Sequence, residues 1–191
     1  MTTITGGLID LEYAAAGLNF PDLGDPAKAA RDADLTAYVV AATAVIEDIV
    51  GPVLQTTKTV SFDGGVTAIV LPDRANSITA VVENGSTLAA GTYFFDPIAS
   101  VVYGGTPIYP RVFYPGKLAI QITYVVGYSP VPATLQLAAR ELVRFWWQQG
   151  KAATRPAYGD AIEATPPQGF AVPKRVIELC TPFLGPQIGF A

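Results

Sequence analysis

The stretch KLAIQITYVVGYSPVPATLQLAARELVRFWWQQG, residues Lys117 to Gly150, decides the fold of this chain. Its first part, up to Val126, is rich in β-branched and aromatic residues, which predicts a buried strand. Pro132 then stands where a first helical turn is expected, and its missing amide donor costs little there. The residues that follow predict a helix over 132–149, ended by Gly150. A strand that turns this tightly into a helix fixes two layers of one domain.

The predicted helix over 132–149 has an unusually wide apolar surface. One face carries Leu135, Ala138, Leu142, Phe145 and Trp146, and the neighbouring Ala139, Val143 and Trp147 widen it. A stripe of this width is broader than one packing contact needs. We therefore expect the helix to contact partners on more than one side.

Two further helices are predicted before this stretch. Residues 8–18 hold good helix formers with apolar residues on one side. Residues 34–50 carry apolar residues at helical spacing and end at Gly51 and Pro52. The segment before them is rich in turn-forming residues, so Asp32 or Asp34 is expected to cap the N-terminus of the second helix.

Residues 53–128 change to short β runs separated by turns. Strands are predicted at residues 57–62, 67–71, 77–83, 92–96, 99–103 and 117–126. Asn84-Gly85 is the strongest hairpin signal, because both residues tolerate the positive φ of a type I′ turn. The pattern predicts an antiparallel β subdomain inserted between helices.

Residues 151–191 contain six of the sixteen prolines, which indicates an extended arm followed by a short helix from about Pro173 to Leu184. The predicted fold class is therefore α+β: a small helical bundle with an inserted antiparallel β subdomain and a C-terminal arm that ends in a short helix. The predicted domains are residues 1–150 and a Pro-rich segment over 151–191.

Composition and charge constrain the function. Half of the 191 residues are hydrophobic and 15% are charged, which leaves little charge to cover the surface of a monomer. Some apolar surface therefore either contacts partners or is packed inside a monomer. The net charge of −4 argues against a surface that neutralises nucleic-acid phosphates. Residues 1–50 hold eight acids and two bases, whereas residues 117–191 hold seven bases and four acids. This asymmetry suits copies that pack side by side, although both sets of charges could simply be solvated.

The residues of ordinary catalysis are scarce. The chain has no His, which removes Ser-His-Asp triads, Cys-His dyads and histidine metal sites. Cys180 stands alone and is expected to pack in the core, with no disulfide. Asp22, Asp25, Asp32 and Asp34 match no calcium loop and are expected at caps and turns. We therefore expect no enzyme activity, no metal and no cofactor.

The chain is also expected to be soluble and intracellularly made. Its first residues lack the basic start and apolar run of a signal peptide, and its most apolar helix is too short for a membrane.

Arg140 and Arg144 lie one helical turn apart, either on a solvated face or in salt bridges to the acidic N-terminal third of another copy. Trp146 and Trp147 are interpreted as core and interface anchors. The predicted subunit interface comprises Arg140, Arg144, Trp146, Trp147, Asp32 and Asp34.

Three stretches, in this order, resemble the head-tail connector, or adaptor, proteins of long-tailed bacteriophages. They are ADLTAYVVAATAVIEDIVGPVLQTTKTVSF, LPDRANSITAVVENGSTLAAGTYFFD and KLAIQITYVVGYSPVPATLQLAARELVRFWWQQ. The first resembles the family's acidic-capped helix followed by Gly and a strand. The second is similar to its inserted strands, and the third to its strand, Gly-Tyr, Pro and Ala-Leu-rich helix. The likeness spans about residues 8–149.

The resemblance implies a structural protein that forms a ring, usually twelvefold, beneath the portal at the capsid vertex. It implies the portal protein and a neck stopper or tail protein as partners, with DNA passing unread through the channel. It places the protein in the head-tail neck of a virion, after synthesis in the host cytoplasm. The C-terminal segment would contact the portal through Phe170, Val176, Ile177, Phe183, Leu184, Ile188 and Phe190.

Other readings of the sequence remain open. A carbohydrate-binding β module could use a groove lined by Tyr93, Phe94, Tyr103, Tyr109, Phe113 and Tyr114. A hydrolytic module could use a carboxylate pair such as Glu83 and Asp96. Another neck or tail ring protein is the third alternative.

Overall fold

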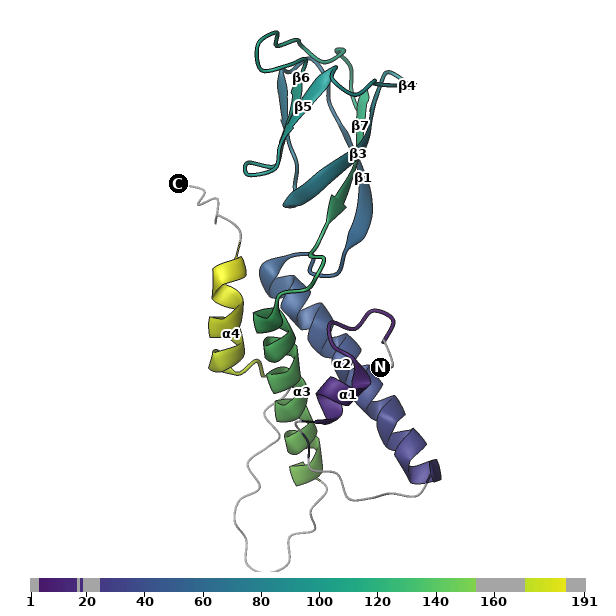
Figure 1. Ribbon diagram of the computed structural model, residues 1–191, viewed down its shortest axis with the longest axis vertical. Coiled ribbons are helices and arrows are strands. Elements are labelled where there is room, and N and C mark those ends of the chain that lie inside the picture. The colour runs from purple at the N-terminus through teal and green to yellow at the C-terminus, as the bar shows by residue number, and fades with distance from the viewer. Residues whose placement is uncertain (1–3, 17, 19–24, 154–170, 185–191) are drawn as a thin grey trace, which may run out of the picture. The chain divides into compact units, whose positions relative to one another are not determined.

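The computed structural model describes residues 4–16, 18, 25–153 and 171–184. The chain divides into two compact units: a helical unit within Met1–Gly51 and Val131–Ala191, and a β unit over Pro52–Pro130. Figure 1 shows the helices of the first and the strands of the second. The predicted α+β class, with an antiparallel β insertion and a short helix toward the C-terminus, is confirmed. Most of the predicted Pro-rich arm lies outside the described residues.

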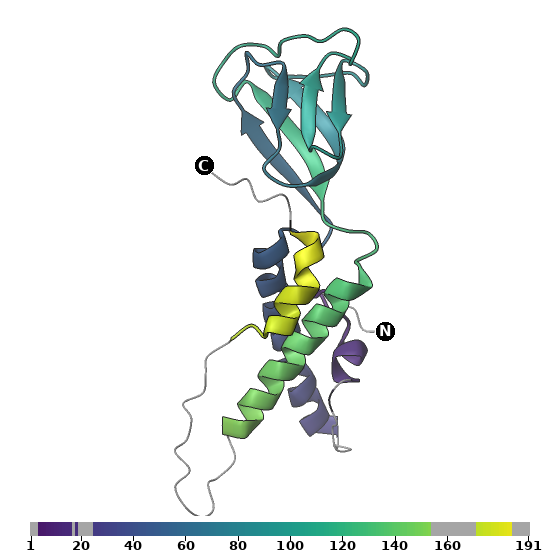
Figure 2. The same cartoon turned by 90° about the vertical axis from the view of Figure 1, so that its left-hand side faces the viewer.

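The described part of the helical unit contains α1 (Leu11–Ala15), α2 (Asp25–Val50), α3 (Ala133–Ala153) and α4 (Lys174–Cys180), with a 3₁₀ turn at Thr181–Phe183. α3 packs against each of the other three helices (Figures 1 and 2). Its buried side chains are Leu135, Ala138, Ala139, Leu142, Val143 and Trp146. The wide apolar surface of this helix is thus used by its own unit, which confirms that it packs on more than one side.

α2 is longer than predicted, because it begins at Asp25 rather than at residue 34. The segment read as turns contains Pro26, which a first helical turn tolerates, followed by alanines and basic residues that favour helix. Asp32 and Asp34 therefore lie inside α2, and the prediction that they cap its N-terminus is wrong. The carboxylate of Asp32 accepts hydrogen bonds from its neighbour Arg31 instead.

α1 and α3 differ from their predicted bounds at the ends. α1 covers only Leu11–Ala15, and Asp10 caps it by accepting a hydrogen bond from the Tyr13 amide at 2.7 Å. α3 continues past Gly150, which was predicted to end it, to Ala153. A glycine within a helix costs about 1 kcal/mol relative to alanine, a cost that tertiary packing readily outweighs. Here a Cβ at Gly150 would lie 3.3 Å from the Tyr38 hydroxyl, so the glycine allows a close approach to α2.

The β unit consists of two antiparallel sheets. The first has the order β1-β7-β3-β4, formed by β1 (Thr56–Phe62), β7 (Ile120–Val126), β3 (Ala75–Glu83) and β4 (Ser86–Thr87). The second has the order β2-β6-β5, formed by β2 (Ala68–Val70), β6 (Val101–Gly104) and β5 (Tyr93–Asp96). Each predicted β run overlaps one of these strands, although β1, β3 and β6 extend one or two residues beyond the predicted bounds. β4 was not predicted, because two residues are too few for a periodic signal.

The core of the β unit follows from the alternation of β7, where every second side chain is buried: Ile120, Ile122, Tyr124 and Val126. They pack with Ile69 and Val102 of the smaller sheet. The Tyr124 hydroxyl donates to Asp73 Oδ2 at 3.1 Å, and Lys58 Nζ lies 2.9 Å from the same oxygen. Burial, together with Asp73, raises the pKa of Tyr124 to about 12, so this phenol stays a hydrogen-bond donor.

The hairpin between β3 and β4 has the predicted geometry. Asn84 and Gly85 have φ of 47° and 79°, and Glu83 pairs with Ser86 across the turn. Both central residues are left-handed, as a type I′ turn requires. The Asn-Gly signal is therefore confirmed as a hairpin.

Candidate functional site

Glu83, Asp96 and Cys180, considered as catalytic groups, have structural roles in the fold. No group of three or more Cys, Asp or Glu side chains that could hold a metal occurs within the described ranges. Glu83 binds Arg111, and Asp96 accepts from the amides of Ile98 and Ala99. Asp22 lies outside the described residues. Cys180 is fully buried, and this burial raises the pKa of its thiol.

The aromatic side chains proposed for a sugar-binding groove do not share one surface. Phe113 is fully buried and Tyr93 packs against the core of the β unit. Phe94 and Tyr103 form a tilted pair on the smaller sheet, with ring centroids 6.3 Å apart. Tyr109 and Tyr114 lie on loops. Because two of the six serve the core, this set does not build the groove that the alternative reading requires.

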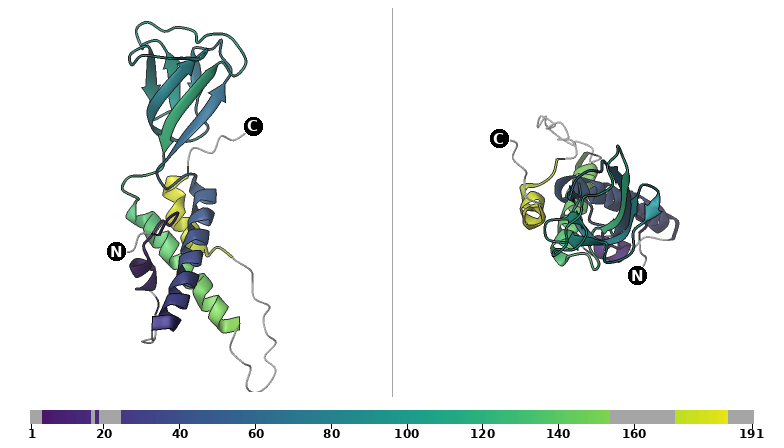
Figure 3. Two further views of the ribbon diagram at one scale, coloured as in Figure 1. Left: turned by 90° about the vertical axis from the view of Figure 1, so that its right-hand side faces the viewer. Right: turned by 90° about the horizontal axis from the view of Figure 1, so that it is seen from above.

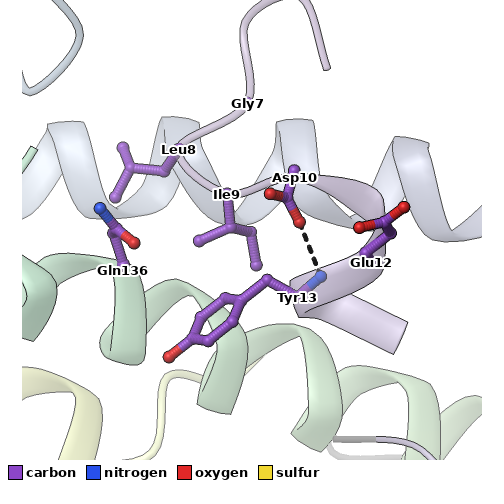
Figure 4. A pocket seen from close by; sticks show the side chains of 7 residues that line it. All are labelled: Gly7, Leu8, Ile9, Asp10, Glu12, Tyr13 and Gln136. Atoms are coloured by element: carbon purple, nitrogen blue, oxygen red, sulfur yellow. Dashed lines mark hydrogen bonds between the residues drawn. The ribbon is translucent and has the colours of Figure 1, made fainter. Parts of the chain in front are cut away.

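A shallow groove of about 390 Å³ lies between the N-terminal segment and α3 (Figure 4). Its lining comprises Gly7, Leu8, Ile9, Asp10, Glu12, Tyr13 and Gln136. Thr43 of α2 anchors this segment, since its buried hydroxyl accepts a hydrogen bond from the Leu8 amide at 2.9 Å. The Arg140 guanidinium stacks over the Tyr13 ring at 4.8 Å, so Arg140 serves to hold α1 on α3.

A second groove, of about 250 Å³, lies between α3 and α4. Its lining comprises Glu141, Arg144, Phe145, Gln148, Pro173, Arg175 and Val176. Arg144 and Arg175 are exposed, and no ion pair or hydrogen bond joins either guanidinium to another residue in the described part of the chain. With Glu141 as the acid in the lining, this α3–α4 groove is positively charged.

The loops of the β unit expose a set of apolar side chains, here called the loop surface: Val66, Ile108, Tyr109, Val112, Tyr114 and Leu118. Their backbone is firmly held. The Phe113 amide donates to Val66 O at 2.9 Å, and Gly64 lies so close to Tyr114 that a Cβ there would be 1.7 Å from its carbonyl oxygen. Exposed apolar side chains are typical of a protein-binding site where they form one contiguous patch.

Glu83 holds one side of the loop surface in place. Its two oxygens accept from Arg111 Nη1 and Nη2, each at 2.9 Å, and Oε1 also accepts from the Tyr114 amide at 2.7 Å. The bonds from Arg111 hold the pKa of the Glu83 carboxyl below its usual 4.5, against the raising effect of partial burial. The carboxylate is therefore a fixed structural anion.

The residues predicted for the subunit interface are dispersed over the helical unit. Trp146 is 3% exposed and its indole N–H donates to Ala171 O at 3.3 Å, so it belongs to the core. Trp147 packs edge-on against Tyr38 of α2, with centroids 5.7 Å apart. Arg144 and Asp34 are exposed, on α3 and α2 respectively.

The residues predicted to bind a portal differ in accessibility. Ile177 and Leu184 are 45% and 36% exposed, and Phe183 is half-buried. Val176 is fully buried against its own unit and offers no surface to a partner in this conformation. Phe170, Ile188 and Phe190 lie outside the described residues.

Sequence reasoning did not find Arg175, and of the loop surface it named only Tyr109 and Tyr114. Arg175 shares a groove with Arg144 only because α4 packs on α3, and nothing local to either helix signals that contact. The loop surface combines turn residues that were interpreted as spacers between strands. The available signal was the number of large, uncharged side chains in these turns, which is higher than spacers between strands need.

The helices of the described segments include none that is long and apolar enough to cross a membrane.

Comparison with known proteins places the chain in a family. A family described as "Head completion protein" matches residues 21–182. A structure described as "Neck of native GTA particle computed with C12 symmetry" contains a chain with a TM-score of 0.61 and 16% identity. Another, "Neck of empty GTA particle computed with C6 symmetry", gives 0.59 and 19%. Each likeness covers 100% of this chain and 96% of the other.

No curated protein is significantly similar in sequence. The likeness to the two neck structures shows the same fold over the full length of the chain, at low identity. The family match extends over most of the chain, through the helices, the β unit and α4. It confirms the resemblance to connector proteins seen in the three quoted stretches. The chain belongs to the head completion protein family.

Proposed function

We propose that this protein forms a twelve-membered ring beneath the portal vertex of a tailed phage or phage-like particle and joins the capsid to the neck and tail. Membership of the head completion protein family indicates a structural role at the junction of head and tail. The ring is supported by the two necks of like fold, computed with C6 and C12 symmetry. Twelve copies satisfy both symmetries, because a twelvefold ring also contains a sixfold axis.

The observation that carries the proposal is the family match over residues 21–182, joined to a likeness of fold over the whole chain. A connector must bind large partners rather than turn over a small one. Accordingly, we propose a non-enzymatic protein without a cofactor. Glu83 and Asp96, which a hydrolytic site would use, are engaged in hydrogen bonds, and the Cys180 thiol is buried.

We propose the portal protein as one partner and a neck stopper or tail protein as the other. The C-terminal segment is the candidate portal contact. Ile177 and Leu184 expose apolar surface there, and the chain ends in the apolar sequence Ile188-Gly189-Phe190-Ala191. Residues of this kind gain free energy when a partner removes them from water. The protein would be made in the host cytoplasm and retained in the virion.

DNA is proposed to pass through the ring without being bound. A net charge of −4 provides no excess of cations to neutralise phosphates, so a polyanion would slide rather than adhere.

The test uses the full-length protein. Sedimentation velocity and negative-stain images, alone and with the portal protein of the same particle, should show rings. A protein that stays monomeric at every concentration and with portal present would contradict the proposal.

A second experiment tests the C-terminal contact in particle assembly. Deleting residues 185–191, which removes Ile188 and Phe190 but keeps α4 and its buried Val176 and Cys180, should leave filled heads that lack tails, because the ring no longer attaches to the portal. The matched control is Val70→Ser, an exposed change on β2 that leaves the C-terminal segment intact. Tail-bearing, DNA-filled particles from the deletion variant would overturn this contact.

A further inference from the structure

The outer face of α2 is apolar, although α1, α3 and α4 leave its side chains exposed. The buried side of α2 consists of Leu35, Val39, Ala42 and Ile46. The opposite side exposes Ala33, Ala37, Val40, Ala41 and Ala44. A helix with apolar residues on both sides is typical of one that is covered on both sides. The surface of α2 therefore has the character of an interface.

Two acids flank this apolar surface. Asp34 and Asp48 are exposed and lie on the same side of α2 as Ala37, by the 100° rotation per helical residue. Neither carboxylate forms an ion pair or hydrogen bond with any residue that the structure describes. The outer face of α2, defined by these seven side chains, is thus apolar at its centre and negative toward both ends.

The α3–α4 groove has the complementary character. Arg144 and Arg175 stand at its rim without ion-pair partners among the described residues, and Phe145 and Pro173 supply apolar lining. The nearby Lys174 is already within 3.7 Å of Glu178, so its charge is partly satisfied. An apolar and acidic surface would match both properties of the groove.

The two surfaces lie on opposite sides of the helical unit. In Figure 2 the helices α3 and α4 lie in front of α2, whereas in the opposite view of Figure 3 α2 lies in front of them. A contact between unlike surfaces on opposite sides is heterologous: each copy uses one surface for the preceding copy and the other for the next. Such contacts produce closed rings when the rotation between copies closes.

We propose that the outer face of α2 in one copy docks on the α3–α4 groove of the next copy. Asp34 and Asp48 would then face the guanidinium groups of Arg144 and Arg175, and Val40 would be removed from water. The inference rests on the proposed ring and names the surfaces that build it. Compared with the interface predicted from the sequence, the proposed one leaves out Trp146, which is buried in the core, and adds Arg175 and Asp48.

The experiment uses two complementary charge reversals in the full-length protein. Variant one is Asp34→Lys with Asp48→Lys, and variant two is Arg144→Glu with Arg175→Glu. In either variant alone, both docking surfaces carry the same sign, so the concentration needed for half-assembly should rise about tenfold or more. All four side chains are exposed, so circular dichroism should show unchanged folding.

Mixing the two variants provides the decisive measurement. The basic α2 face of variant one then fits the acidic groove of variant two, and the acidic face of variant two fits the basic groove of variant one. An equimolar mixture should restore rings in which the variants alternate, which an even number of subunits permits. Arg74→Glu with Lys117→Glu is the control: both residues are exposed on the β unit, the net charge change equals that of variant two, and assembly should be unaffected.

The outcomes separate the two proposals. A wild-type protein that forms no ring overturns the proposed ring and this inference with it. A wild type that forms rings while each variant does so equally well overturns only the inference. Loss of assembly in each variant without recovery in the mixture would also overturn it, because the charges would then serve a contact other than the one between copies.

Discussion

At the scale of single residues, Glu83 shows how one carboxylate organises a loop. It joins the end of β3 to Arg111 and to the Tyr114 amide, which lie far along the chain. Glu83→Gln keeps the shape but removes the charge, so we expect a loss of about 1 kcal/mol of stability at pH 7. Calorimetry should show a lower Tm for the β unit, and the Tyr114 amide should exchange its hydrogen faster than in the wild type.

The effect of Glu83 should depend on pH with a defined sign. Its folded-state pKa lies below the usual 4.5, so folding favours the ionised form. The stabilisation is fully present above the unfolded-state pKa and is lost as the pH falls through the lowered folded-state value. The difference between wild type and Glu83→Gln should therefore shrink below about pH 4.5.

Glu178→Gln is the matched control for Glu83→Gln. Glu178 pairs with Lys174 at 3.7 Å on an exposed helix surface, where about 0.5 kcal/mol or less is expected. Equal effects of the two substitutions would contradict the structural role of Glu83.

Cys180 gives a simple test of the packing of α4. Its side chain is fully buried and its thiol pKa is raised by burial, which lowers the thiolate fraction at a given pH. A thiol reagent at pH 7.5 should label the native protein slowly and the urea-unfolded protein rapidly. Because Cys180 is the sole cysteine, the label reports this site alone. Rapid labelling of the native protein would mean that α4 is not docked as described.

At the scale of elements, Thr43 joins the N-terminal segment to α2. Its hydroxyl accepts from the Leu8 amide at 2.9 Å and donates to Val39 O at 2.8 Å. Thr43→Val keeps the volume but leaves the Leu8 amide without an acceptor, which costs about 1–3 kcal/mol when buried. We expect the amide of Leu8 to exchange faster and the stability of the helical unit to fall by that amount.

Thr36→Val provides the control for Thr43→Val. The Thr36 hydroxyl donates to Asp32 O within the same helix, and no other segment depends on it. Its substitution should change stability by about 0.5 kcal/mol or less. If both valine variants behaved alike, the hydrogen bond to Leu8 would not be what anchors the N-terminal segment.

Elements were predictable from the sequence where a local pattern determines them. The alternation of β7, the Asn84-Gly85 turn and the amphipathic α3 each carry their own signal, and each is confirmed. The start of α2 was missed because Pro26 and its neighbours are equally common in turns and first helical turns. The extension of α3 through Gly150 was missed because a glycine at this point is an ordinary helix terminator, and the closeness of Tyr38 on α2 is not part of any local pattern.

The candidate surfaces were less predictable than the elements, for a related reason. Trp146 and Arg144 are both polar-tipped residues of one helix, yet packing buries the first and leaves the second exposed. Arg144 and Arg175 share a groove through tertiary contact between α3 and α4. Charge asymmetry along the sequence indicated that unlike surfaces exist, but their positions required the packing of the helices.

At the scale of the whole molecule, the β unit has the properties of an inserted domain. Its core is built from residues between Ile69 and Val126, all within the unit. Its two ends are tied together, because the Tyr128 amide donates to Val53 O at 2.8 Å and Leu54 forms a bridge with Tyr128. Adjacent ends and a separate core are what domain insertion requires.

We therefore expect residues 52–130 to fold when produced alone. The isolated unit should show a β-type circular dichroism spectrum and a cooperative thermal transition, because its core and its sheet hydrogen bonds are all internal. Ile122→Ala, which removes a fully buried side chain, should lower its stability by about 2–5 kcal/mol, whereas Thr57→Ala on exposed β1 should have a much smaller effect. An unfolded fragment, or one that is insensitive to Ile122→Ala, would mean that the helical unit supplies part of this core.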